Sequence, residues 1–255
     1  MTNEYPLVLL HGGGDAPTAR ESTFGRMAQA FLGGGDGPLL IVAAAAEPEE
    51  ARETTDYYSE LFLALAVPAE RLQPIWVRPE RPLTGAQVAG YAPAGLFVCG
   101  GATPVYHAAL CADLSWVEYV RGQRVAYGGT SAGAAIAATR AIVGGWQTGD
   151  GAARPMIFAG AGEGLDALTV RPGAGLVPFA VDVHAGQMGT LTRLIQAVAG
   201  GLTDEGWAID EDTLLVAQGS RLEVAGRGHA YRVERLGVGE VRLEILAAPM
   251  EYHRG

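Results

Sequence analysis

A serine flanked by small residues carries the clearest chemical signal in the chain. Residues 129–133 read Gly-Thr-Ser-Ala-Gly, after an apolar run at 125–128 and before a helix-forming run at 134–138. A serine on such a strand-to-helix turn is held in an exposed conformation, and its small neighbours let the chain turn without clashes. The pattern therefore predicts Ser131 as a nucleophile and the Ala132 backbone N–H as a donor to a developing oxyanion. The alternative is a glycine-rich turn that only packs a strand on a helix.

Two other segments offer the partners that a serine nucleophile needs. The apolar run 96–99 ends in Gly100 and Gly101, where backbone N–H groups can face a reacting carbonyl oxygen, so Gly101 is predicted as the second oxyanion donor. His184 is the only histidine between Ser131 and the final apolar runs, and it stands just before a helical run. Although a lone histidine is more often structural, this one completes a serine-first order known from convergent triads and is predicted to be the general base.

The elements that must position these residues follow from the apolar pattern. In the first half, short runs rich in Val, Leu and Ile alternate with helical stretches, which is typical of a doubly wound, mostly parallel α/β sheet. The predicted strands are 7–10, 39–43, 72–77, 95–99 and 125–128, and the predicted helices are 20–32, 49–66, 85–91 and 115–121. After a helical run at 190–199, short apolar runs broken by Gly and acidic residues predict antiparallel strands and hairpins. The length of 255 residues suits one domain, 1–255.

Composition excludes several classes of function. The formal net charge of -10 and the scattered basic residues argue against a nucleic-acid partner. The first apolar run is too short to span a membrane, so we expect a cytoplasmic protein without a membrane partner. Cys99 and Cys111 have neither metal nor disulfide spacing and are expected to be reduced thiols, and no histidine pair has ligand spacing. We therefore expect no metal and no cofactor.

Four segments, taken together, resemble a known family. Residues 129–135, Gly-Thr-Ser-Ala-Gly-Ala-Ala, match the nucleophile motif of cyanophycinases, and the Gly100-Gly101 pair stands where that family has its own Gly-Gly turn. Residues 182–187 resemble the family's Asp-Gln-His-Phe-Ser-Gln segment, and residues 207–214 resemble its Gly-Ile-Asp-Glu-Asp-Thr-Ala stretch. The motifs occur in order over nearly the whole chain. The sequence thus resembles cyanophycinases and aspartyl dipeptidases of peptidase family S51.

That resemblance implies an α/β fold like class I glutamine amidotransferases, a serine nucleophile, no cofactor, and cleavage of small or β-linked aspartyl peptides by a homodimer. It also implies which residues bind the substrate: Gly100, Ala102, Thr103, Asp182, Gln187 and Arg193. Two departures affect this binding. Ala102 and Thr103 follow the turn where the family commonly has an acidic residue or Asn and then Gln. Met188 and Thr190 replace arginines that grip substrate carboxylates, which leaves Arg193 and predicts poor cleavage of cyanophycin.

The third member of the triad is left open by the sequence. The dipeptidase relatives carry an acid about fifteen to twenty residues after the serine, and Asp150 is the carboxylate near that distance. Its alternative interpretation is a solvated loop acid between glycines. Asp182, two residues before His184, is interpreted as structural, substrate-facing or able to orient the histidine. Glu211 and Asp212 are most simply interpreted as hairpin-turn acids.

Two rival functions remain. Residues 11–14, His-Gly-Gly-Gly, copy the oxyanion sequence of some lipases, which would suit an esterase of the α/β-hydrolase fold. In that fold, however, this loop follows a third strand, whereas here it follows the first. The second rival is a catalytically silent binding protein that kept the fold and lost the family's substrate residues.

Overall fold

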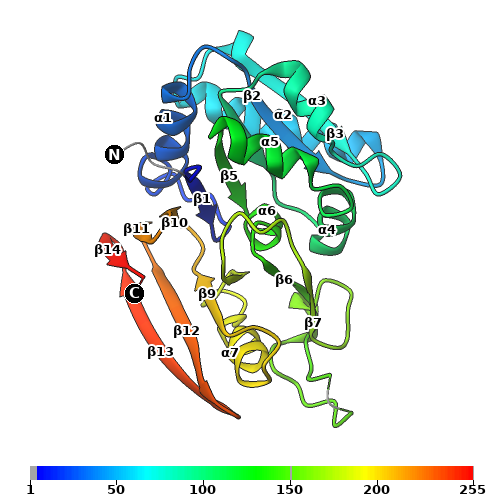
Figure 1. The fold of residues 1–255 in the computed structure, drawn as a ribbon, viewed down its shortest axis with the longest axis vertical. Coiled ribbons are helices and arrows are strands. Elements are labelled where there is room, and N and C mark those ends of the chain that lie inside the picture. The colour runs from blue at the N-terminus through cyan, green and yellow to red at the C-terminus, as the bar shows by residue number, and fades with distance from the viewer. Residues whose placement is uncertain (1–4, 150, 255) are drawn as a thin grey trace.

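Two β-sheets form the frame of the molecule (Figure 1). The fold comes from a computed structural model that describes residues 5–149 and 151–254. The first sheet has the strand order β14-β11-β10-β1-β5-β4-β2-β3 and the second has the order β13-β12-β9-β8-β6-β7. The strands are β1 Val8–His11, β2 Leu39–Ala44, β3 Leu72–Val77, β4 Gly95–Val98, β5 Ala126–Thr130, β6 Arg140–Gly144, β7 Thr169–Pro172, β8 Ala180–Val183, β9 Glu205–Ile209, β10 Thr213–Gln218, β11 Arg221–Gly226, β12 His229–Gly237, β13 Glu240–Ala247 and β14 Met250–His253.

The first sheet confirms the predicted fold class. Strands β1, β5, β4, β2 and β3 pair in parallel, and β10 joins them antiparallel beside β1. The five strands predicted in the first half are all present, with ends that differ by at most two residues. The chain then departs from the expectation, because the antiparallel strands of the second half are shared between the two sheets. β10, β11 and β14 extend the first, whereas β9, β12 and β13 belong to the second.

The helices lie between the strands as the alternation predicts. They are α1 Arg26–Gly33, α2 Pro48–Ala64, α3 Gly85–Tyr91, α4 Thr103–Leu110, α5 Ser115–Gln123, α6 Ala132–Ile136 and α7 Leu191–Ala199, with short helical turns η1 Glu21–Gly25, η2 Ala69–Arg71 and η3 Ala159–Ala161. The bounds of α3 are those predicted, since Thr84 and Gln87 form a capping box at its start. Helix α4 was not predicted. Pro104 is the signal that could have found it, because proline suits the first turn of a helix.

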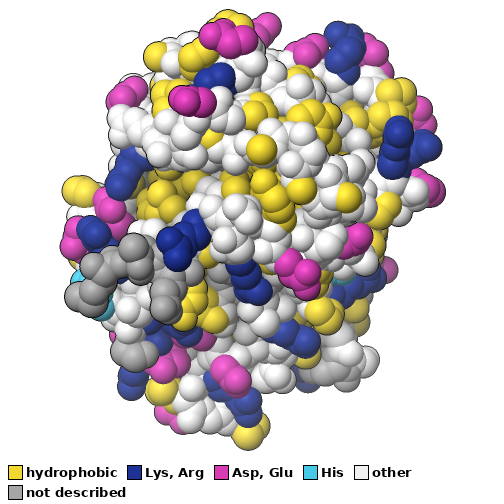
Figure 2. Space-filling model, turned by 45° about the horizontal axis from the view of Figure 1, so that its top comes forward, with side chains coloured by type: hydrophobic (Ala, Val, Ile, Leu, Met, Phe, Trp, Pro, Cys, Tyr) yellow, Lys and Arg dark blue, Asp and Glu magenta, His cyan; other side chains and the backbone are white. Residues whose placement is uncertain are grey.

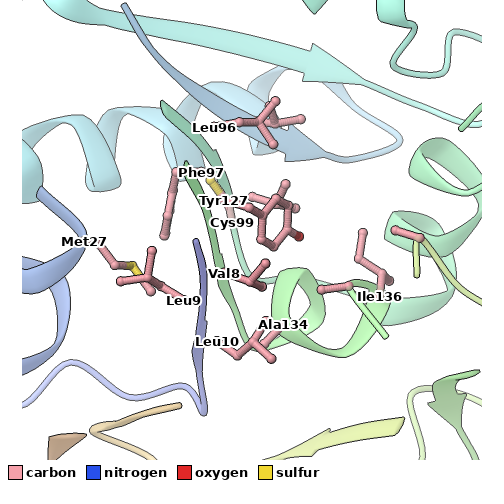
Figure 3. Packing of buried hydrophobic residues seen from close by; sticks show 14 of the residues in the cluster. Val8, Leu9, Leu10, Met27, Leu96, Phe97, Cys99, Tyr127, Ala134 and Ile136 are labelled. Atoms are coloured by element: carbon pink, nitrogen blue, oxygen red, sulfur yellow. The ribbon is translucent and has the colours of Figure 1, made fainter. Parts of the chain in front are cut away.

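The main core surrounds the parallel strands. Successive residues of β1 point to opposite faces, so Leu9 packs with Met27 on one side while Val8 and Leu10 lie on the other (Figure 3). The same buried cluster continues into the second sheet through Val181 of β8. A smaller cluster lies under α7 and includes Leu194. The two sheets therefore share one main core.

The surface carries basic and acidic side chains in mixture on the face shown in Figure 2. Within the described ranges, no helix is long and apolar enough to cross a membrane. The same residues contain no group of three or more His, Cys, Asp or Glu side chains that could hold a metal ion.

Candidate active site

Ser131 lies on a sharp turn between β5 and α6. Its backbone has φ 50° and ψ -114°, a conformation that residues other than glycine rarely adopt. The turn is possible only because the residues on either side, Gly129 and Gly133, have no side chain. A Cβ atom at Gly129 would lie 2.5 Å from the Gly133 carbonyl oxygen, and one at Gly133 would lie 2.3 Å from the Val98 carbonyl oxygen. The elbow thus packs directly against the end of β4.

The structure brings His184 to this serine across 53 residues of sequence. The distance from Ser131 Oγ to His184 Nε2 is 2.8 Å. His184 follows the last residue of β8, and its backbone amide donates to the Gly12 carbonyl at 2.9 Å. A Cβ atom at Gly13 would lie 2.1 Å from the imidazole Cε1. The His-Gly-Gly-Gly loop therefore packs against the histidine ring, and glycine at residue 13 leaves room for that ring.

Glu211 is the acid that contacts the histidine. Its Oε1 lies 2.7 Å from His184 Nδ1, and both side chains are partly buried. Glu211 lies in the turn between β9 and β10, but these strands belong to different sheets, so the turn is not the hairpin that was expected, and it faces the candidate base. Asp150, predicted as the third triad member, lies outside the described residues. The signal that could have favoured Glu211 is its place just beyond the carboxyl end of a buried strand.

Asp182 and Arg193, which were predicted to bind the substrate, contact each other instead. They form a buried ion pair with distances of 2.6 and 2.8 Å, and their exposed fractions are only 1% and 4%. Asp182 does not orient His184, because β8 ends at Val183 and His184 has a left-handed φ of 58° that breaks the strand alternation. In this structure the two side chains satisfy each other, which agrees with the structural interpretation of Asp182 and leaves neither side chain free to reach a substrate.

The other predicted binding residues lie in two groups. A Cβ atom at Gly100 would be 3.3 Å from Ser131 Cβ, so the Gly100-Gly101 turn borders the nucleophile. Ala102 is exposed, whereas Thr103 is buried at the start of α4 and its amide donates to Glu163 at 3.0 Å. On the other side, Gln187 Oε1 accepts from the Glu211 amide at 2.9 Å. Gln187 thus supports the acid of the histidine.

His11, from the His-Gly-Gly-Gly run noted in the sequence, also lies beside Ser131 and His184. It ends β1, and its Nδ1 lies 3.0 Å from the Thr130 hydroxyl, next to the nucleophile. Burial, together with the nearby His184, lowers the pKa of His11 to about 3, although Asp15 acts in the opposite direction. Its Nε2 has no hydrogen-bond partner among the described residues. A neutral imidazole is therefore buried beneath the site.

A large cavity in the described part of the chain lies away from these residues. It has a volume of about 730 Å³, and Val8, Arg121 and Phe179 are among its lining residues. Val8 starts β1, whereas the serine lies beyond the carboxyl end of the neighbouring strand β5, so the cavity is at the opposite edge of the sheet. Chemistry, not cavity size, locates the candidate site.

A serine at a strand-to-helix turn, hydrogen-bonded to a histidine that contacts a carboxylate, is the arrangement of a hydrolase with a nucleophilic serine. Comparison with known proteins then shows which proteins this chain resembles. The chain is 29% identical over 214 residues to cyanophycinases of Trichormus variabilis and of a Nostoc species, and each match covers 72% of this chain and 66% of the relative. The matched part is thus just under two thirds of the length of these relatives. No protein-family model matches the chain.

Solved structures share the fold. A peptidase from an acI-B1 actinobacterium has a TM-score of 0.69 and 16% identity, and the match covers 98% of this chain and 97% of that one. A candidate peptidase E protein from Listeria monocytogenes EGD-e has a TM-score of 0.50 and 13% identity, over 86% and 97% of the two chains. The chain is thus similar in sequence to cyanophycinases and shares its fold with these two solved structures.

Proposed function

We propose that this protein is a serine peptidase or isopeptidase that hydrolyses small or β-linked aspartyl peptides through an acyl-enzyme on Ser131. The observation that carries the proposal is the chain of contacts from Ser131 Oγ through the His184 ring to Glu211, at 2.8 and 2.7 Å. An ionised Glu211 accepts the Nδ1 proton of His184, which leaves Nε2 as the acceptor of the serine proton. The same contacts favour an active enzyme over a binding protein without catalytic activity.

In the first half-reaction, Ser131 Oγ bonds to the carbonyl carbon while its proton moves to His184 Nε2. The carbonyl oxygen becomes negative and accepts hydrogen bonds from the N–H groups of Gly101 and Ala132. The C–N bond then breaks, and His184 gives the proton to the leaving amine. In the second half-reaction, water loses a proton to His184 and attacks the acyl carbon. The bond between that carbon and Ser131 Oγ then breaks, and His184 returns the proton to Oγ.

The proposal is tested by labelling and by two substitutions. A fluorophosphonate is expected to modify Ser131, and Ser131→Ala should abolish both labelling and hydrolysis while the fold is retained. His184→Ala should cost nearly as much, about 10⁴-fold or more, and the double variant should be little worse, because the pair acts as one unit. A Ser131→Ala protein with full turnover would refute the assignment. Faster cleavage of p-nitrophenyl esters than of isoaspartyl or aminoacyl amides would favour the esterase alternative.

The substrate proposal rests on the residues that follow His184. We propose a smaller or less carboxylate-rich peptide than cyanophycin, because Met188 and Thr190 offer no cation for carboxylates. Met188 is exposed, whereas Thr190 is buried and its hydroxyl donates to the Val183 carbonyl at 2.5 Å. An arginine therefore fits at residue 188 but not at residue 190 without disrupting the end of β8.

Met188→Arg is the variant that tests this substrate preference. One charge-assisted hydrogen bond should raise cleavage of a β-aspartyl-arginine polymer by about 10- to 100-fold, with little change on short aspartyl peptides. Met188→Gln, of similar length but uncharged, is the matched control and should show no gain. Efficient polymer degradation by the wild type would contradict the preference. A homodimer and a cytoplasmic location remain proposals from the resemblance and the composition.

A further inference from the structure

The Gly100-Gly101 turn lies between two different surroundings. A Cβ atom at Gly100 would lie 3.3 Å from Ser131 Cβ and 3.8 Å from the Tyr58 hydroxyl. A Cβ atom at Gly101 would instead lie 2.6 Å from the ring of Tyr106. The two residues therefore face opposite sides, as successive residues of an extended backbone do, with the nucleophile on one side and Tyr106 on the other.

Tyr106 also makes a direct hydrogen bond to this turn. It projects from α4, is 1% exposed, and its hydroxyl donates to the Gly100 carbonyl oxygen at 2.7 Å. Burial, followed by the nearby Cys99, raises the pKa of Tyr106 well above its usual range. The raised pKa favours the protonated hydroxyl, which is the form that donates.

The direction of one carbonyl determines the direction of the next amide. In a planar trans peptide the C=O of residue 100 and the N–H of residue 101 point in opposite directions. Because Tyr106 binds the Gly100 carbonyl, the Gly101 N–H is directed away from Tyr106. Two consecutive glycines would otherwise allow the peptide plane to rotate at little steric cost, and rotation would turn a carbonyl oxygen to where the amide had been.

We propose that Tyr106 is a positioning residue for the reaction: its hydroxyl holds the Gly100-Gly101 peptide in the one orientation that offers the Gly101 N–H to the oxyanion. The inference rests on the proposed function of Ser131. Tyr106 is buried and its hydroxyl binds the Gly100 carbonyl, not Ser131, so its effect on the reaction passes through the peptide that it orients. The other proposed donor, the Ala132 N–H, is held by α6 and needs no such support.

The test is Tyr106→Phe, which removes the hydroxyl and keeps the ring. The rate constant for fluorophosphonate labelling of Ser131 should fall about 10- to 100-fold, since the phosphonyl oxygen occupies the oxyanion position and one donor is lost for much of the time. With a peptide substrate, kcat should fall by the same factor and KM should change little. p-Aminophenylalanine at residue 106, which restores a donor, should recover labelling.

Tyr127→Phe is the matched control. Tyr127 is equally buried and its hydroxyl donates to a backbone carbonyl, that of Gly133, at 2.6 Å. Tyr127→Phe should lower the melting temperature about as much as Tyr106→Phe does. It should not, however, show the fall in kcat at nearly constant KM that is expected for Tyr106→Phe. Labelling of Tyr106→Phe at the wild-type rate would overturn the inference, and so would equal losses of labelling in both variants.

A measurement on the wild type covers the case in which Tyr106→Phe fails to fold. Phosphonylation of Ser131 should move the amide proton resonance of Gly101 downfield, because this N–H acquires a charged acceptor. An unchanged Gly101 resonance on a labelled Ser131 would overturn the role of Tyr106 while leaving the serine hydrolase intact. No labelling of wild-type Ser131 would refute the proposed function itself, and the inference with it.

Discussion

Ser131 and His184 both have backbone conformations that their side chains disfavour, with φ values of 50° and 58°. Such conformations cost on the order of 1–3 kcal/mol each and persist where neighbouring contacts hold them. Here the holding contacts come from one loop: the Ser131 amide donates to the His11 carbonyl at 3.0 Å, and the His184 amide donates to the Gly12 carbonyl at 2.9 Å. The proposed nucleophile and base are thus held by two adjacent residues at the end of β1, His11 for Ser131 and Gly12 for His184.

Glu211→Gln should separate the two candidate acids. A neutral amide no longer stabilises the imidazolium and can favour the wrong tautomer, so kcat should fall by roughly 10² to 10⁴. The comparison variant is Asp150→Asn. Steady-state kinetics of both variants on the same peptide substrate measure which carboxylate the reaction needs. A large loss in Asp150→Asn together with normal activity in Glu211→Gln would identify Asp150 as the third member instead.

Buried His11 should make the protein acid-sensitive. Its pKa is lowered from 6.5 to about 3, chiefly by burial, so between these pH values the unfolded chain binds a proton that the folded protein does not. The free energy of unfolding should therefore decrease as the pH falls from 6.5 toward 3, by up to about 1.4 kcal/mol per pH unit from this residue. Denaturant titrations of wild type and His11→Asn measure the difference. Parallel pH curves for the two proteins would contradict the prediction.

At the scale of elements, β8 and α7 are joined by the buried pair of Asp182 and Arg193. The guanidinium makes two bonds to the carboxylate, and Nη1 also donates to the Ala161 carbonyl at 2.9 Å. This contact links a strand, a helix and the turn η3 directly behind His184. Its position indicates a role in holding the segment that carries the base.

Arg193→Met should destabilise the fold, not weaken substrate binding. Removal of one partner leaves a buried charge and should lower the free energy of unfolding by about 3–5 kcal/mol, whereas Asp182→Asn/Arg193→Met should cost less than the sum of its single changes. Thermal or denaturant unfolding measures these values. A rise in KM with unchanged stability would instead restore Arg193 as a substrate ligand.

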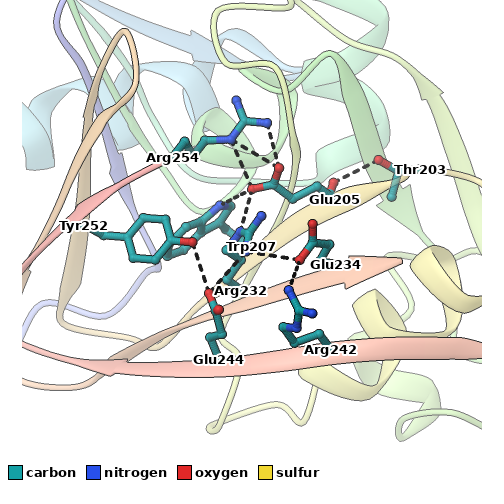
Figure 4. A network of polar contacts seen from close by, with 9 residues as sticks. All are labelled: Thr203, Glu205, Trp207, Arg232, Glu234, Arg242, Glu244, Tyr252 and Arg254. Carbon is teal, nitrogen blue, oxygen red and sulfur yellow. Dashed lines mark hydrogen bonds and ion pairs between the residues drawn. The ribbon is translucent and has the colours of Figure 1, made fainter. Parts of the chain in front are cut away.

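At the scale of the molecule, the end of the chain connects the two sheets. β14 pairs with β11 in the first sheet, and the next residue, Arg254, reaches Glu205 of β9 in the second sheet with a shortest distance of 2.6 Å. Arg232 of β12 contacts the same carboxylate at 3.0 Å, and Glu234 and Glu244 surround Arg232 (Figure 4). The Glu205 carboxylate therefore ties the residue that follows β14, a strand of the first sheet, to the second sheet.

Glu205→Gln should lower stability in a pH-dependent way. Burial works to raise the pKa of Glu205, but hydrogen bonds from Arg254 and Arg232 outweigh it and hold the pKa below the usual value of 4.5. The contribution of the ionised carboxylate is thus present above pH 4.5 and is lost as the pH falls through the lowered value. We expect a loss of about 2 kcal/mol at pH 7 that shrinks in acid, measured by chemical unfolding. A difference that is constant down to pH 3 would contradict this explanation.

Local patterns in the sequence were enough for the fold class and for the main candidates. The alternation of short apolar runs and helices predicted the parallel strands, since the apolar runs of β1, β2, β4 and β5 reflect their burial on both faces. The Gly-x-Ser-x-Gly spacing predicted the turn at Ser131, because the small residues that such a turn requires are neighbours in the chain. His184 was predicted from order along the chain, and the structure has its ring 2.8 Å from the serine oxygen.

Only the tertiary structure decided which distant turns meet. Glu211 and Gln187 reach the site from segments whose approach depends on how β8, β9 and β10 are shared between two sheets, and no local pattern encodes that division. Asp182 and Arg193 looked like substrate ligands in the sequence, yet an acid and a base eleven residues apart satisfy each other once the strand and the helix pack. The exposure and pairing of a charged side chain are set by the neighbours that folding brings to it, which is why its role could be read only from the folded chain.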